Sequence, residues 1–312
     1  MPSVSELAEV ESVHQVAELL ARAAAEGRRV SIEREGGEVV VSTARLDQVL
    51  EHEAGDLTAI VEAGVRIRDL NERLAAAGQR LALDPPGNPT IGACLAADLS
   101  GPLRHRFGAA RDLVIGVTVV LADGTIASSG GKVVKNVAGY DLAKLFCGSA
   151  GRLGLIVRVA LRLHPVPEAS RTLVAPVDDP ADAQTRARAI LRAPLAPSSV
   201  DVHWPGRLAI RFEGAARAVE AQLAAARALV GGDEDDGAGW GEAEERQAAA
   251  RGRLLFAPGD LAGALAGLDE AVVRVAAGVA YVPEPVPDPR DPVEVALAER
   301  VRAAFDPQGV LV

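Results

Sequence analysis

Apolar residues recur along the chain with two spacings, which predict a mixture of helices and strands. Helical spacing of apolar side chains predicts a helix over Val13–Glu26, which Gly27 ends, and a second helix over residues 66–77. An Asp-Gly pair at 123–124 predicts a hairpin turn. Short runs rich in Val, Ile and Leu predict strands at 29–32, 39–42, 58–62, 80–83, 113–121, 125–128 and 155–163.

The pattern changes beyond residue 167. Strands at 172–175, 199–204 and 207–212 and helices at 181–192 and 215–229 predict a ferredoxin-like layer. Residues 231–239 combine four acids with four glycines and are expected to form a solvated loop. A Pro-rich linker at 283–292 precedes a last helix at 293–304. The proline-containing exit at 164–167 predicts two domains, 1–167 and 168–312, in an α+β fold.

Composition narrows the classes of function. A net charge of −10 without a basic tract, and only 3% aromatic residues, argue against nucleic-acid binding. The N-terminus lacks the features of a signal peptide, and no apolar run reaches eighteen residues, so we expect a cytoplasmic chain without direct membrane insertion. Cys94 and Cys147 lack the spacing of a metal site and are expected to be small buried residues.

A long irregular stretch, residues 85–111, and two later segments carry most of the chemical information. Closely spaced glycines leave room for a ligand to touch the main chain, whose N–H and C=O groups then recognise a large planar or phosphorylated molecule. The only lysines of the chain also lie nearby, at Lys132, Lys135 and Lys144. The motifs read DPPGNPTIGA at 84–93, SGP at 100–102, FGAARD at 107–112, VVKNVAGYD at 133–141 and GSAGRLG at 148–154.

In this order the motifs resemble those of the vanillyl-alcohol-oxidase (PCMH-type) FAD-binding flavoproteins. That family has a PTIGG-like loop ending in Ser-Gly, then YGxxRD, an Asp-Gly hairpin, KNxxGYDL and GSxGxLG. The likeness covers roughly residues 56–167. The string at 133–142 is most similar to the FAD-binding subunit of bacterial glycolate oxidase, and AFDPQG at 304–309 resembles the C-terminal signature of that subunit family.

The resemblance implies a two-subdomain FAD-binding fold followed by a ferredoxin-like cap, with non-covalent FAD between them. It implies the FAD-binding subunit of a glycolate (2-hydroxyacid) oxidase or dehydrogenase. Such a subunit would work on a small 2-hydroxy acid with a related catalytic flavoprotein subunit and an iron–sulfur subunit, through which it could lie at the inner membrane. The cofactor-binding residues that it implies are Pro85, Pro89, Thr90, Ile91, Gly92, Ala93, Ser100, Gly101, Arg104, Gly108, Arg111, Lys135, Asn136, Gly148, Ser149, Gly151, Gly154 and Ile156.

One loop departs from the family pattern. In the family a GGGTS-like loop after the first strand binds the diphosphate through successive backbone N–H groups. Here residues 33–38 read EREGGE, which leaves only Gly36 and Gly37 and adds three carboxylates. Two lost charge-assisted hydrogen bonds, at about 1.5 to 3 kcal/mol each, weaken binding by roughly 10² to 10⁴. We therefore expect FAD occupancy to be reduced.

Catalytic residues are not evident in the sequence. Oxidation of a 2-hydroxy acid requires a base near the hydroxyl and a cation for the carboxylate. No two histidines have metal-ligand spacing, so no metal site is predicted. His105 is the one candidate base, with an ordinary surface loop as the alternative. Two other functions stay open: a degenerate assembly subunit of the same complex that has lost FAD, and a self-sufficient FAD-dependent alcohol or hydroxyacid oxidase.

Overall fold

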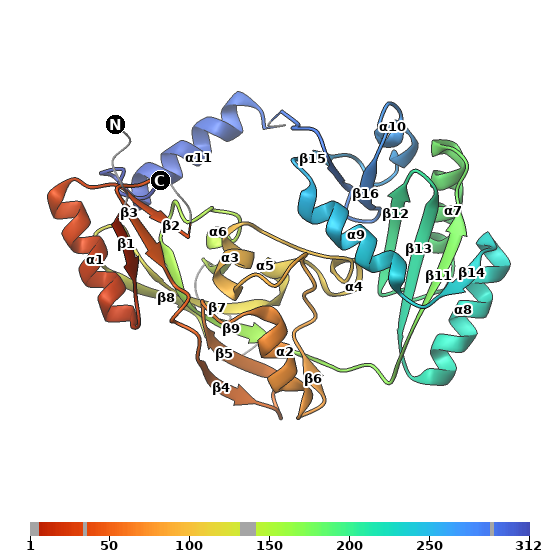
Figure 1. Cartoon of the computed structure of the whole chain (residues 1–312), viewed down its shortest axis with the longest axis horizontal. Coiled ribbons are helices and arrows are strands. Elements are labelled where there is room, and N and C mark those ends of the chain that lie inside the picture. Colours follow the sequence, from red (N-terminus) through yellow and green to blue (C-terminus); the bar gives the residue numbers. More distant parts are fainter. Residues whose placement is uncertain (1–5, 34–35, 132–141, 288–289) are drawn as a thin grey trace.

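The N-terminal layer is a parallel sheet covered by the first predicted helix (Figure 1). The computed structural model describes residues 6–33, 36–131, 142–287 and 290–312. Helix α1 (Val13–Glu26) begins at Ser12, whose side chain accepts from the backbone N–H of Gln15, and ends at Gly27, as predicted. The strand order is β1 (Glu6–Glu9), β3 (Val39–Ser42) and β2 (Val30–Ile32).

The C-terminus returns to this layer. The backbone N–H of Val30 donates to the carbonyl of Val310 at 2.7 Å, and Val310 and Leu311 are buried in the same core as α1. Phe305, at the end of α11 (Pro292–Phe305), packs against the next sheet. The last residues of the chain thus pack with the N-terminal half, and the domain boundary near residue 167 stays a prediction.

A five-stranded antiparallel sheet forms the second layer. Helices α2 (Ile67–Ala75) and α6 (Ala143–Phe146) contribute to its core, and β6 (Gln79–Arg80) pairs with β10 (His164–Pro165) at one end. The strand predicted at 80–83 therefore comprises only Gln79 and Arg80. The strand order is β4 (Val49–Glu53), β5 (Thr58–Glu62), β9 (Leu155–Arg162), β7 (Val114–Val120) and β8 (Ile126–Gly130).

The stretch 85–111 is less irregular than predicted. It contains α3 (Ile91–Ala96), α4 (Arg104–Phe107) and the first part of α5 (Ala110–Leu113). Helices of four to six residues span less than two turns, so apolar periodicity does not reveal them, and tertiary contacts stabilise them. Ile91, Leu95 and Leu113, all fully buried, supply those contacts.

The remaining residues build a seven-stranded antiparallel sheet with a core of its own. Its first four strands have the order β14-β11-β13-β12, with α7 (Pro180–Arg192) after β11 and α8 (Ala216–Val230) after β13, which confirms the ferredoxin-like layer. Helix α9 (Ala238–Ala249) lies between this sheet and the N-terminal half (Figure 1). The strands are β14 (Asp233–Asp235), β11 (Ala169–Pro176), β13 (Arg207–Gly214), β12 (Ser199–Trp204), β16 (Ala271–Arg274), β17 (Val279–Val282) and β15 (Gly252–Leu255), and α10 (Leu261–Leu265) packs on α7.

The acidic segment 231–239 is not wholly a loop, and the prediction was wrong on this point. Its residues 233–235 pair with Thr172, Leu173 and Val174 of β11. The open edge of β11 offers backbone hydrogen bonds, which outweigh the low strand propensity of acidic residues.

Candidate functional site

A slot of about 260 Å³ lies between the end of β2, helix α3 and the start of β9. Small side chains leave a wall flat and its main chain within reach, so such a slot suits a flat ring or an extended chain. We call it the apolar slot. Its lining residues are Ile32, Glu33, Thr43, Gly92, Ala93, Ala96, Ala97, Ala150, Gly154, Leu155 and Ile156.

The predicted run from Pro89 to Ala93 fixes helix α3 against the second sheet. Thr90 caps the helix, its side chain accepting from the backbone N–H of Ala93 at 3.2 Å. The carbonyl of Pro89 accepts from Ile67, and Ile91 is fully buried. Gly92 and Ala93 therefore form the wall of the slot, while the other three residues anchor it.

The predicted segment 148–156 closes the slot from the other side. Its backbone is tied to α3, since the N–H of Gly148 donates to Leu95 and that of Ala150 donates to Ala96. Gly154 and Ile156 line the slot, and Gly151 lies buried beside them. The hydroxyl of Ser149 is buried and has no hydrogen-bond partner among the described residues.

Other predicted residues lie away from the apolar slot. Gly101 packs so closely on the chain that a Cβ there would lie 1.7 Å from the carbonyl oxygen of Asp84. Ser100 is buried, and its hydroxyl accepts from Arg104 at 3.0 Å. Their role in the described structure is to hold the segment around Asp84, which includes the buried Pro85.

Gly108 and Arg111 also lie away from the apolar slot. Gly108 ends α4, and Arg111 is exposed on α5; neither lines the apolar slot. Lys135 and Asn136 lie outside the described residues.

The shortened loop after β2 uses its own donors internally. The backbone N–H of Gly37 donates to the hydroxyl of Ser31 at 3.1 Å, and a Cβ on Gly37 would lie 2.6 Å from the nitrogen of Ser31. Glu33, at the mouth of the slot, accepts from the backbone N–H of Thr43 at 2.5 Å and from its hydroxyl at 2.9 Å. The Glu33 carboxylate thus already accepts hydrogen bonds from both donors of Thr43, a residue that lines the slot.

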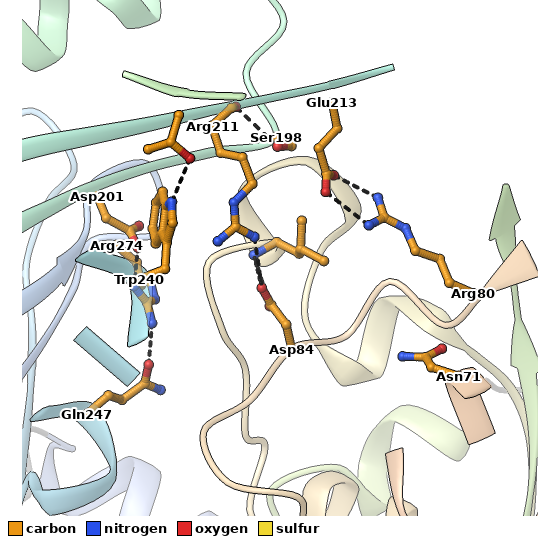
Figure 2. A network of polar contacts seen from close by, with 12 residues as sticks. Asn71, Arg80, Asp84, Ser198, Asp201, Arg211, Glu213, Trp240, Gln247 and Arg274 are labelled. Atoms are coloured by element: carbon orange, nitrogen blue, oxygen red, sulfur yellow. Dashed lines mark hydrogen bonds and ion pairs between the residues drawn. The ribbon is translucent and has the colours of Figure 1, made fainter. Parts of the chain in front are cut away.

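A second cavity, of about 230 Å³, separates residues 84–102 from the seven-stranded sheet. We call it the polar pocket. Arg211 of β13 reaches into it between Trp240 and Asp84 (Figure 2). The guanidinium lies 4.3 Å from the Trp240 ring centroid, and its Nη1 is 3.7 Å from Oδ2 of Asp84. The lining residues are Asp84, Pro86, Pro102, Arg211, Trp240, Glu244, Gln247 and Arg274.

Asp84 lines the polar pocket with a carboxyl whose pKa its surroundings shift. Its Oδ1 accepts from the backbone N–H of Leu103 at 3.0 Å. Burial raises the pKa of Asp84 to about 7, although the charge of Arg211 acts in the opposite direction. Near neutral pH this carboxyl can therefore both hold and accept a proton.

A buried network forms the far wall of the polar pocket. Arg274 of β16 pairs with Asp201 and also donates to Gln247 (Figure 2). The amide of Gln247 in turn donates to the carbonyl of Ser100 at 2.8 Å. Trp240 is held by its indole N–H, which donates to Thr172 at 2.9 Å. These contacts fix α9 against both halves of the chain.

A second link between the halves lies beside the pocket. Arg80 of β6 donates twice to Glu213 of β13, at 3.0 and 2.7 Å, and Arg106 donates to the carbonyl of Glu213. The Arg80 and Glu213 side chains are 17% and 6% exposed, so little water competes with the pair.

The histidines do not contribute to either cavity. Burial lowers the pKa of His105, which lies on α4 and lines neither cavity. Burial and neighbouring arginines lower the pKa of His203 to about 3, so that it is neutral. Among the described residues no group of three His, Cys, Asp or Glu side chains could hold a metal ion. No described helix is long and apolar enough to cross a bilayer.

The residues of the polar pocket were missed by sequence reasoning. Asp84 stands at the head of the glycine-rich stretch and could have been singled out by its position before two prolines. Arg211 and Trp240 carry no local signal, because an arginine in a strand and a tryptophan in a helix are ordinary.

Comparison with known proteins shows what the chain is similar to. The profile of the "FAD binding domain" family matches residues 3–130. The N-terminal part of the chain is therefore similar to FAD-binding domains of the PCMH type. The solved structure of an alkyldihydroxyacetonephosphate synthase superposes on 97% of this chain and 75% of its own, with a TM-score of 0.72 at 17% identity, which shows the shared fold.

Several curated relatives of this chain are named as subunits of an oxidase or as dehydrogenases. Glycolate oxidase subunit GlcD of Bacillus subtilis (strain 168) is 36% identical over 54% of this chain and 36% of the relative. Glycolate oxidase subunit GlcE of Escherichia coli (strain K12) is 33% identical over 64% of this chain and 56% of the relative. Mitochondrial D-lactate dehydrogenase [cytochrome] of Arabidopsis thaliana is 37% identical over 43% of this chain and 24% of the relative. The matched part is thus between a quarter and a little over half of each relative.

The match of residues 3–130 to the FAD binding domain confirms FAD as the cofactor, and the apolar slot offers a partial fit to it. The small side chains of α3 and the segment 148–156 fit a flat or extended group, and the buried Ser149 hydroxyl offers a polar contact beside them. The fit to the diphosphate of FAD is poorer, because the backbone N–H groups of Gly37 and Thr43 already donate to side chains of this chain. Gly92, Ala93, Ala150, Gly154 and Ile156 would line the bound cofactor.

Proposed function

We propose that this chain is the FAD-binding subunit of a multi-subunit glycolate (2-hydroxyacid) oxidase or dehydrogenase. The observation that carries the proposal is that one segment, residues 84–102, lines both cavities. It faces the apolar slot through α3 and the polar pocket through Asp84, Pro86 and Pro102. A cofactor in the slot and an acid in the pocket would share this wall.

The polar pocket supplies the two groups that oxidation of a hydroxy acid requires. Arg211, held over Trp240, can bind the carboxylate of the acid through two N–H groups. Asp84 can accept the hydroxyl proton, because a base with a pKa of about 7 is well matched to neutral pH. FAD, when bound, would accept the hydrogen of the broken C–H bond together with its two electrons. The rate of substrate oxidation should therefore rise with pH through about 7.

The partners that we propose are a related catalytic flavoprotein subunit and an iron–sulfur subunit. The relatives named as glycolate oxidase subunits support a complex of more than one flavoprotein chain. We also propose that the chain works in the cytoplasm or at the inner membrane through these partners, with the cap formed by residues 168–312.

The test is an anaerobic titration of the FAD-loaded protein with glycolate and D-lactate, followed by the bleaching of the flavin absorbance. We expect bleaching in the assembled complex, a weaker apparent affinity for the acid in Arg211→Met, and a slower rate above pH 7 in Asp84→Asn. The same titration of the isolated chain distinguishes a subunit of a complex from a self-sufficient oxidase. Full turnover of glycolate or D-lactate by the isolated chain would favour the self-sufficient oxidase.

A second candidate function has one observation in its favour. Glu33 occupies the donors of Thr43, which favours an assembly subunit that no longer binds FAD. A protein that stays colourless in the complex, even after incubation with excess FAD, would support this reading and refute the proposed one.

A further inference from the structure

Three hydrogen-bond donors at the mouth of the apolar slot converge on one carboxylate. The backbone N–H of Thr43 donates to Oε1 of Glu33 at 2.5 Å, and the Thr43 hydroxyl donates to the same oxygen at 2.9 Å. The hydroxyl of Ser42 donates to Oε2 at 3.3 Å. Thr43 itself is 4% exposed, so these donors are held in place by the end of β3. Such a set of donors is an anion site.

The occupant of this anion site is a residue in a costly backbone conformation. Glu33 has φ 55°, in the left-handed region that L residues with a Cβ avoid. The side chain is exposed except where its oxygens meet the donors. The carboxylate can therefore leave for water by rotating about its side-chain bonds, while the donors cannot follow it.

The position of the site points to its natural ligand. Glu33 and Thr43 both line the apolar slot, so a molecule that lies in the slot brings its linker to these donors. A neutral linker would gain little from displacing a carboxylate, whereas a phosphate can replace it at each donor. The ligand class is thus a dinucleotide whose diphosphate follows a flat apolar part.

We propose that Ser42 and Thr43 form the diphosphate site for FAD and that Glu33 is a built-in competitor for it. This inference rests on the proposed function in one respect, namely that a flavin lies in the apolar slot. The Glu33 carboxylate repels the diphosphate of an approaching FAD. Binding of FAD then requires the carboxylate to leave the donors of Ser42 and Thr43. The chain thus binds FAD more weakly than the slot alone would allow.

The experiment measures the dissociation constants of FAD and riboflavin by quenching of flavin fluorescence. Riboflavin has the same ring and no phosphate, so it reports on the slot alone. We compare the wild-type chain with Glu33→Gln, which removes the charge, and Glu33→Gly, which frees all three donors and suits the positive φ. Glu38→Gln is the matched control, because it removes one charge from the same loop, where the Glu38 side chain accepts from the backbone N–H of Arg29.

We expect Glu33→Gln and Glu33→Gly to bind FAD about 10- to 100-fold more tightly than wild type, the range of one charge-assisted hydrogen bond. Riboflavin binding should stay unchanged in both, and Glu38→Gln should alter neither ligand more than about threefold. An unchanged ratio of FAD to riboflavin affinity, or weaker FAD binding in both Glu33 variants, overturns the inference. If wild type binds riboflavin and the ratio of FAD to riboflavin affinity is the same in all variants, the inference fails and the proposed function stands. If neither wild type nor any variant binds either flavin, the inference and the proposed function both fail.

Discussion

Replacement of Asp84 by asparagine should change how the stability of the protein depends on pH. In the folded chain burial raises the pKa of Asp84 from 3.8 to about 7. The folded state therefore keeps a proton that the unfolded state loses, and the free energy of unfolding falls as pH rises from about 4 to 7. The full change corresponds to at most about 4 kcal/mol, of which about 3 kcal/mol falls between pH 5 and pH 8.

Asparagine is a close test of this reasoning because it keeps the size of the side chain. Its carbonyl oxygen can still accept from Leu103, while the titrating group is gone. The difference in unfolding free energy, Asp84→Asn minus wild type, should thus grow by about 3 kcal/mol from pH 5 to pH 8 and then level off.

Urea unfolding followed by circular dichroism at pH 5, 6, 7 and 8 measures this difference. Asp123→Asn is the control, since a hydrogen bond from Thr125 lowers the pKa of Asp123 below 3.8 and its titration is complete before pH 5. Its difference from wild type should be constant over the whole range. If the wild-type protein instead gains stability relative to Asp84→Asn as pH rises, the ion pair with Arg211 outweighs burial and the reasoning is wrong.

Three further predictions test other parts of the structure. Glu213→Gln should destabilise the chain by about 3 kcal/mol, because it leaves the largely buried Arg80 without its charged partner. Glu234→Gln, in the exposed pair with Arg171, should cost less than about 1 kcal/mol. Equal effects of the two substitutions in urea unfolding would contradict this contrast. Gly101→Ala should abolish the folded state or the link between the halves, since its Cβ would overlap the main chain, whereas Gly241→Ala, with open space around it, should leave the thermal midpoint unchanged or higher. Cys94 should resist alkylation in the native protein, because burial raises the pKa of its thiol to about 12, and rapid labelling followed by mass spectrometry would speak against the structure.

Elements with a long, regular pattern were predicted from the sequence. Helix α1 and the succession of β11, α7, β12, β13 and α8 follow from spacing, since each has enough residues to repeat its period. The short helices in 85–111 and strand β14 were not predicted, because their formation depends on the surfaces against which they pack.

The candidate site divides in the same way. The ordered glycine motifs, the resemblance to FAD-binding flavoproteins and the unusual acidic loop at 33–38 could be recognised in the sequence, since each is local in the chain. The contact of the Glu33 carboxylate with Thr43 and the contact of Arg211 with Asp84 depend on the tertiary structure. The Arg211 and Asp84 contact joins positions more than a hundred residues apart. The partner of a charged side chain over such a distance is set by how sheets and helices pack, and residue spacing carries no record of it.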